Sequence, residues 1–80
     1  MKVFEYIEVI ARFHQYVMRG NTGDAATFAA KLGISRASLF NLINELESYG
    51  IDIEYSRARQ TYLYKYPEKV EIKISICQHL

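Results

Sequence analysis

Apolar and polar positions between residues 24 and 50 follow the pattern of two short helices joined by a tight turn. Asp24 can cap the first helix, whose apolar residues continue to Leu32 before Gly33 interrupts it. Ser35 can cap the second helix, which ends before Gly50 and repeats apolar residues at three- and four-residue steps, namely Leu39, Leu42, Ile43, Leu46 and Tyr49. A three-residue turn containing Gly between two such helices predicts a helix-turn-helix unit over 24–50.

The preceding segment, residues 2–19, contains no Gly or Pro and predicts a longer helix that Gly20 and Asn21 close. Its apolar side chains cover roughly two-thirds of the helix circumference, whereas a surface helix needs an apolar arc of little more than 100°. Because one small core cannot use this whole surface, we expect the surplus to pack against the same helix of a second chain, as in a two-fold homodimer. The alternative is that a C-terminal strand covers it within a monomer. The interface residues expected are Tyr6, Val9, Phe13 and Tyr16.

After Gly50 apolar residues no longer recur at every third or fourth position but at every second one. This alternation predicts a β-hairpin over residues 51–66. The hairpin loop, residues 56–60, is polar and carries Arg57 and Arg59. Pro67 and Glu68 end the second strand. A further alternation over residues 70–77 predicts a third strand, which either extends the hairpin sheet or crosses to a partner chain.

The length of 80 residues predicts one domain, residues 1–80, because so short a chain cannot sustain two separate cores. The net charge of +1, from ten basic and nine acidic side chains, is weak for a nucleic-acid-binding protein. The single Cys77 and the isolated His14 offer no metal-ligand spacing, so we expect no metal or other cofactor. Acidic residues near the N-terminus interrupt any signal peptide or membrane span, so we expect a cytoplasmic protein with no membrane partner.

Catalytic chemistry has little support in the sequence, and we expect that the chain is not an enzyme. No nucleophile and base pair, paired carboxylates or phosphate-binding loop is visible. His14 continues an apolar stripe and has no visible partner, which favours a buried or interface histidine over a metal ligand or pH switch. Tyr55, Tyr62 and Tyr64 fall on positions that alternate inward, which favours packing over stacking with single-stranded bases.

The run FAAKLGISRASLFNLINELESYGIDIEYSRARQTYLY, in the order helix, turn, helix, hairpin, resembles the N-terminal winged helix-turn-helix domain of DeoR-type and WYL-type bacterial transcriptional regulators and of the biotin repressor. That group typically has a leucine-glycine pair, a serine with a nearby arginine, then a glycine followed by an isoleucine strand and a tyrosine-bearing strand. The resemblance covers about residues 24–66. It implies an α+β winged helix of three helices and a hairpin wing, to which this chain adds the predicted C-terminal strand.

In that family the second helix of the unit enters the DNA major groove, its first residues hold phosphate, and the wing touches an adjacent groove. Carried over by position, the resemblance implies phosphate or base-edge contacts from Ser35, Arg36 and Ser38, with Asn41 pointing at bases. It implies wing contacts from Arg57 and Arg59, and the family often has a glycine where this chain has Arg59 and Gln60. The DNA-binding residues expected are Ser35, Arg36, Ala37, Ser38, Phe40, Asn41, Asn44, Arg57, Arg59 and Gln60.

The outer face of the second helix agrees with this expectation through its side-chain chemistry. Asn41 and Asn44 can pair with adenine, and Ala37 or Phe40 can touch a thymine methyl group. Glu45 and Glu47, late in the same helix, would repel phosphates. We therefore expect a small DNA-binding protein that acts as a homodimer on double-stranded DNA, as a transcriptional regulator or architectural factor. The alternative is a winged-helix module that binds another protein and no nucleic acid, which the near-neutral charge favours.

Overall fold

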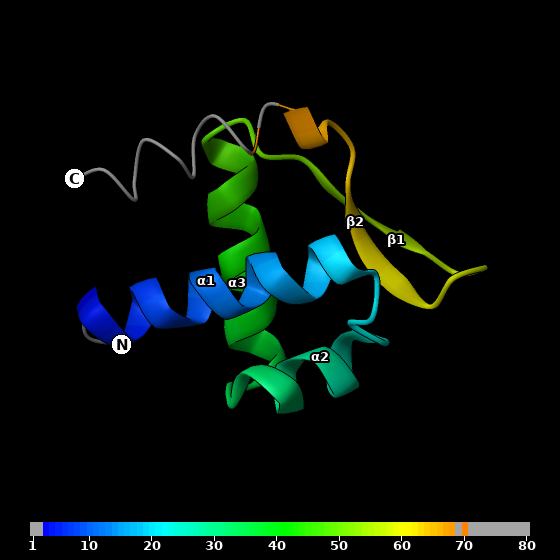
Figure 1. Cartoon of the computed structure of the whole chain (residues 1–80). Coiled ribbons are helices and arrows are strands. Elements are labelled where there is room, and N and C mark those ends of the chain that lie inside the picture. The colour runs from blue at the N-terminus through cyan, green and yellow to red at the C-terminus, as the bar shows by residue number, and fades with distance from the viewer. Residues whose placement is uncertain (1–2, 69, 71–80) are drawn as a thin grey trace.

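Three helices precede a pair of strands in the computed structural model, which describes residues 3–68 and 70. The helices are α1 (Val3–Arg19), α2 (Ala25–Leu32) and α3 (Arg36–Ser48), and the strands are β1 (Ile53–Ser56) and β2 (Thr61–Tyr64). The strands are antiparallel, with Tyr55 opposite Tyr62. The fold is therefore α+β, three helices followed by a hairpin (Figure 1), an arrangement compatible with the predicted winged helix.

The predicted signals at the helix ends are confirmed. The Asp24 carboxylate accepts a hydrogen bond from the backbone N–H of Thr27 at 2.9 Å, which caps α2. Gly33 ends α2 in the left-handed conformation with φ of 72°, where a residue with a side chain would be strained. Ser35 then caps α3. The helix-turn-helix boundaries follow from these local interactions, with residues 33–35 forming the turn.

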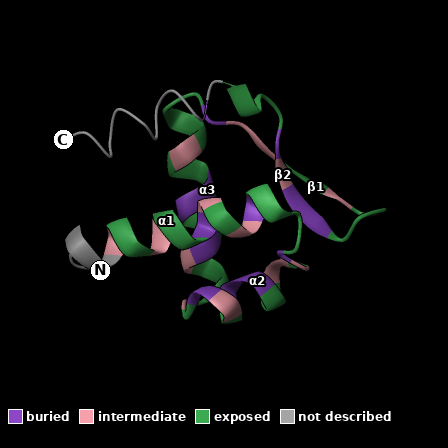
Figure 2. Cartoon of the chain, in the orientation of Figure 1, coloured by how far each residue is buried: buried purple, intermediate pink, exposed green. Residues whose placement is uncertain are grey.

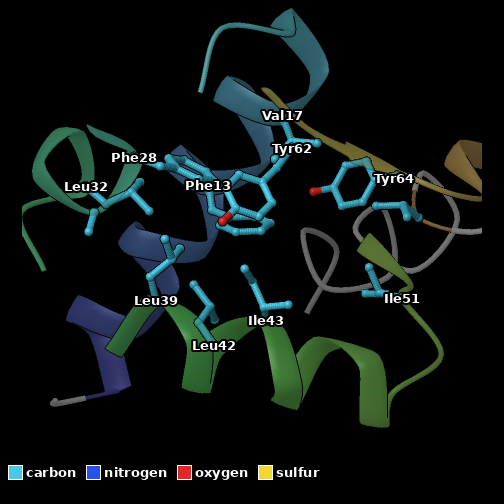
Figure 3. Close-up of a cluster of buried hydrophobic side chains, with 12 residues drawn as sticks. Phe13, Val17, Phe28, Leu32, Leu39, Leu42, Ile43, Ile51, Tyr62 and Tyr64 are labelled. Carbon is cyan, nitrogen blue, oxygen red and sulfur yellow. The ribbon is translucent and has the colours of Figure 1, made fainter. Parts of the chain in front are cut away.

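The core lies where the three helices meet β2 (Figure 2). Phe13 of α1 stacks on Phe28 of α2 with ring centroids 5.0 Å apart, and the ring of Tyr62 of β2 lies 5.7 Å from that of Phe28. Figure 3 shows Leu39 and Ile43 rising from α3 toward these rings. The apolar stripe of α3 thus packs into the core, so the opposite face of this helix points away from the core.

The structure corrects one residue of the interface predicted on α1. Phe13 is completely buried within its own chain, so it is a core residue and not an interface residue. Tyr6, Val9 and Tyr16 are half-buried and pack against the same core, Tyr16 with its ring edge-on to Phe28. The core uses more of α1 than expected because α2, α3 and β2 all pack around this helix. Among the α1 side chains that the structure describes, residues 6–19, the exposed apolar ones are Ile7, Ala11 and Met18.

The hairpin is shorter than predicted and is followed by a helical turn. The predicted span of 51–66 narrows to two strands of four residues, with Ile51 and Tyr66 outside them. Val70 is buried and is helical, as are Pro67 and Glu68, rather than part of a strand. The rest of the predicted third strand, residues 71–77, lies outside the described residues.

The structure also differs from the expectations for His14 and for Tyr55. His14 has a partner, because its Nδ1 lies 3.0 Å from the hydroxyl of Tyr64, whose pKa is raised by burial. Tyr62 and Tyr64 are buried as predicted, but Tyr55 remains about one-third exposed at 36%. The hairpin therefore presents one tyrosine to solvent beside the helices.

Candidate nucleic-acid interface

The face of α3 opposite its core stripe is open to solvent. At about 100° per residue, Ala37, Asn41 and Asn44 lie on the side away from Leu39 and Ile43, and all three are exposed. Neither Asn side chain forms a hydrogen bond with any residue of the described part of the chain. The donor and acceptor atoms of both amides are therefore available to a ligand.

The first turn of α3 combines a capping serine with an unpaired cation. The Ser35 hydroxyl accepts the backbone N–H of Ser38 at 3.0 Å and donates to the Ser38 hydroxyl, also at 3.0 Å. Arg36 is exposed and forms no ion pair within residues 3–68 and 70. Ser35 therefore holds the helix start in place, while Arg36 and the positive end of the helix dipole face solvent.

Tyr62 joins the start of α3 to the hairpin. Burial is the main cause that raises the pKa of Tyr62; the Tyr55 hydroxyl and the Asp24 carboxylate raise this pKa further, while Arg36 lowers it. These influences show that Asp24 and Arg36 lie within electrostatic range of the Tyr62 hydroxyl. Tyr55 contacts the Tyr62 ring edge-on, with centroids 4.9 Å apart. Tyr55 of β1 thus contacts Tyr62 directly, and Arg36 of α3 lies within electrostatic range of the same tyrosine.

The hairpin turn, residues 57–60, carries the other two predicted cations. Arg57 and Arg59 are exposed, and their side chains have no ion-pair partner in the described part of the chain. Gln60 has φ of 52°, in the left-handed region that favours glycine. This is a position at which the resemblance anticipated glycine. The turn projects away from the helices (Figure 1), so both arginines can reach a molecule seated beside the domain.

A buried pair of threonines, which the sequence analysis missed, attaches the hairpin to the helices. The Thr22 hydroxyl accepts the backbone N–H of Tyr62 at 2.8 Å, and the Thr61 hydroxyl accepts the backbone N–H of Thr22 at 3.1 Å. Both threonines are at most 1% exposed. No periodic pattern marks Thr22, which lies in a loop, so only the assembled structure shows that the turn end of the hairpin is anchored beside α2.

The acidic residues of α3 do not all face the same way. Glu45 accepts a hydrogen bond from the Tyr6 hydroxyl of α1; burial, followed by this bond, raises the pKa of Tyr6 to about 12. Glu45 is therefore held on the side of α3 next to α1, roughly 140° around the helix from Phe40. Glu47, by contrast, lies in the last turn and is exposed.

The described residues were also searched for groups that could bind a metal ion and for helices that could span a membrane. Among residues 3–68 and 70, no group of three His, Cys, Asp or Glu side chains is placed to hold a metal ion. None of the described helices is long and apolar enough to cross a membrane. Comparison of the chain with models of known protein families, with curated proteins and with solved structures found no match.

Proposed function

We propose that this chain is a small winged-helix protein that binds double-stranded DNA as a homodimer and acts as a transcriptional regulator or architectural factor. The observation that carries the proposal is the open face of α3, where Asn41 and Asn44 are exposed and form no side-chain hydrogen bond with any residue that the structure describes. The apolar stripe on the other side of α3 holds the helix against the core. A major groove about 12 Å wide admits an α-helix presented in this way.

Three exposed cations accompany this face of α3. Arg36 stands at the start of α3, and Arg57 and Arg59 stand in the hairpin turn, all three exposed. Phosphate contacts supply most of the sequence-independent affinity for DNA. These arginines have no ion-pair partner among the described residues, so within that part of the chain no ion pair has to break before they contact phosphate. Their positions therefore support a complex in which α3 enters the groove and the hairpin lies along the neighbouring backbone.

The dimer is proposed from α1 and from the size of the module. A single DNA-binding module of this kind buries roughly 600–1,000 Å² of protein surface, so a second copy increases affinity by binding two sites at once. Ile7 and Met18 are 56% and 48% exposed, and they share one side of α1 with Ala11. A two-fold interface would bury this patch, the α1 patch, against its own copy.

The same exposed apolar side chains favour a second candidate function, a module that binds another protein through the α1 patch. The low net charge of +1 also agrees with it. The two functions differ in one measurable property, because DNA binding must weaken steeply with salt. A protein that binds through the α1 patch alone would show no affinity for duplex DNA.

Fluorescence anisotropy with labelled mixed-sequence duplexes at roughly 50 and 200 mM salt tests the proposal. We expect binding at the lower concentration, and a linear fall of the logarithm of the binding constant with the logarithm of the salt concentration. Arg57→Ala and Arg59→Ala should each reduce the slope by about one. Lys65→Ala, at the other end of the hairpin, is the matched control and should leave the slope unchanged. Absence of duplex binding at low salt would refute DNA binding.

A further inference from the structure

We infer that α3 recognises A·T base pairs, and that Phe40 determines this specificity by contacting the 5-methyl group of thymine. The inference rests on the proposed function, since it requires α3 to lie in the major groove. It names the class of sequence that the protein selects and the residue that selects it.

Phe40 is an aromatic side chain on the outer surface of α3, outside the hydrophobic core. It is 43% exposed, whereas the neighbouring Leu39 is completely buried. At about 100° per residue Phe40 lies on the same shoulder as Arg36, one turn earlier, and borders the open face that carries Asn41 and Asn44. Arg36 is the α3 residue that lies within electrostatic range of Tyr62 of the hairpin. A ligand that contacts Arg36 and the open face of α3 would therefore cover Phe40.

The chemistry of the surrounding side chains points to A·T pairs as that ligand. Arginine and lysine are the usual readers of guanine, and α3 carries neither after Arg36. Asparagine pairs with N6 and N7 of adenine, and the amides of Asn41 and Asn44 are exposed and have no hydrogen-bond partner within residues 3–68 and 70. Apolar side chains contact the methyl group that thymine alone presents in the major groove, and Ala37 and Phe40 are both exposed here.

The length of the open face of α3 determines how many base pairs it can contact. Ala37 and Asn44 are seven residues apart, which corresponds to roughly 10 Å along a helix that rises 1.5 Å per residue. This is about three base pairs at 3.4 Å each. Each protomer is therefore expected to select a short run of A·T pairs, with Phe40 seated near its middle.

The test compares three duplexes of equal length by fluorescence anisotropy at one salt concentration. The first alternates A and T, the second replaces every thymine by deoxyuridine, which lacks only the methyl group, and the third alternates G and C. We expect the wild-type protein to bind the first duplex at least about fourfold more tightly than the second, a factor that corresponds to burial of one methyl group. Binding to the G·C duplex should be the weakest of the three.

Phe40→Ala should bind the thymine and deoxyuridine duplexes equally, at the affinity that the wild-type protein has for deoxyuridine. Because Phe40 is partly exposed and outside the core stripe, this variant is expected to fold, which circular dichroism checks. Tyr49→Ala is the matched control, since Tyr49 is a 72% exposed aromatic residue that caps the other end of α3. It should retain the preference for thymine.

The outcomes separate this inference from the proposed function. A wild-type protein that binds all three duplexes equally would overturn the inference and leave DNA binding intact. Failure to bind any of them would overturn the proposed function itself. Retention of the thymine preference by Phe40→Ala would show that another residue reads the methyl group, and would refute the assignment of Phe40.

Discussion

The hydroxyl oxygens of Thr22 and Thr61 lie 3.1 Å apart in the interior of the protein, 39 residues apart in sequence. Through them the linker between α1 and α2 is bonded to the first residue of β2. The same two side chains satisfy the backbone N–H groups of Thr22 and Tyr62. This arrangement fixes the direction in which the hairpin turn, with its two arginines, leaves the helical part of the domain.

Thr61→Val should destabilise the fold by about 1–3 kcal/mol, because it leaves the buried N–H of Thr22 without an acceptor. Urea denaturation measures this free energy. Thr61→Ser keeps the acceptor oxygen and loses one buried methyl group, about 0.8 kcal/mol, and is the control. Equal stability of the valine variant and the wild-type protein would show that the threonine pair does not anchor the hairpin.

Gln60→Gly should stabilise the protein by about 1 kcal/mol, because the left-handed conformation costs a residue with a side chain roughly that much. For a domain of this size the gain corresponds to a rise of about 4–8 °C in the melting temperature. Calorimetry checks it. Ala58→Gly, in the same turn but without a positive φ, should give no gain because it only adds freedom to the unfolded chain. Gains from both variants would contradict strain at Gln60.

Two substitutions of Ser35 separate its capping function from its proximity to phosphate. Ser35→Ala should lower the free energy of unfolding by about 1 kcal/mol through loss of the α3 cap. Ser35→Asp retains a capping oxygen and should keep nearly wild-type stability, yet weaken duplex binding because its carboxylate repels phosphate. Chemical denaturation and anisotropy measure the two effects. If Ser35→Asp binds DNA as tightly as the wild-type protein, the DNA phosphates do not lie near the start of α3.

The stability of α2 should fall in acid through Asp24. Hydrogen bonds from the backbone and side chain of Thr27 lower the pKa of the Asp24 carboxyl, and Arg36 lowers it slightly further. Because this pKa is lower in the folded than in the unfolded chain, the stabilisation is complete above the unfolded value of about 3.9 and is lost as the pH falls through the folded value. Asp24→Asn, measured by thermal melting between about pH 2 and 7, should remove this contribution. A pH dependence unchanged by the substitution would contradict it.

Ile7→Lys and Met18→Lys should convert the proposed dimer to a monomer, because each places a charge in the α1 patch without touching the core. Both residues are about half exposed, so the fold should persist. Light scattering during gel filtration measures the mass. Glu8→Lys, exposed on another side of α1, is the control and should leave the dimer intact. A wild-type chain that is monomeric at high concentration would end the dimer proposal.

Local signals in the sequence determined the ends of the helices and the position of the hairpin turn. Asp24, Gly33 and Ser35 act within three or four residues of their own positions, so their effect on the backbone does not depend on distant parts of the chain. The alternation on either side of Arg57 and Arg59 is likewise local. The outward direction of Asn41 and Asn44 also followed from helical periodicity, because the leucines of α3 occupy the opposite side.

Only the tertiary structure decided which of the many apolar residues of α1 belong to the core. Periodicity gives the direction of a side chain around a helix, but not how far the neighbouring elements wrap around it, and so Phe13 was misplaced in an interface while Ile7 and Met18 remain exposed. The pairing of His14 with Tyr64 joins residues 50 apart in sequence. Such contacts depend on the meeting of separate elements in space, which no pattern along the chain encodes.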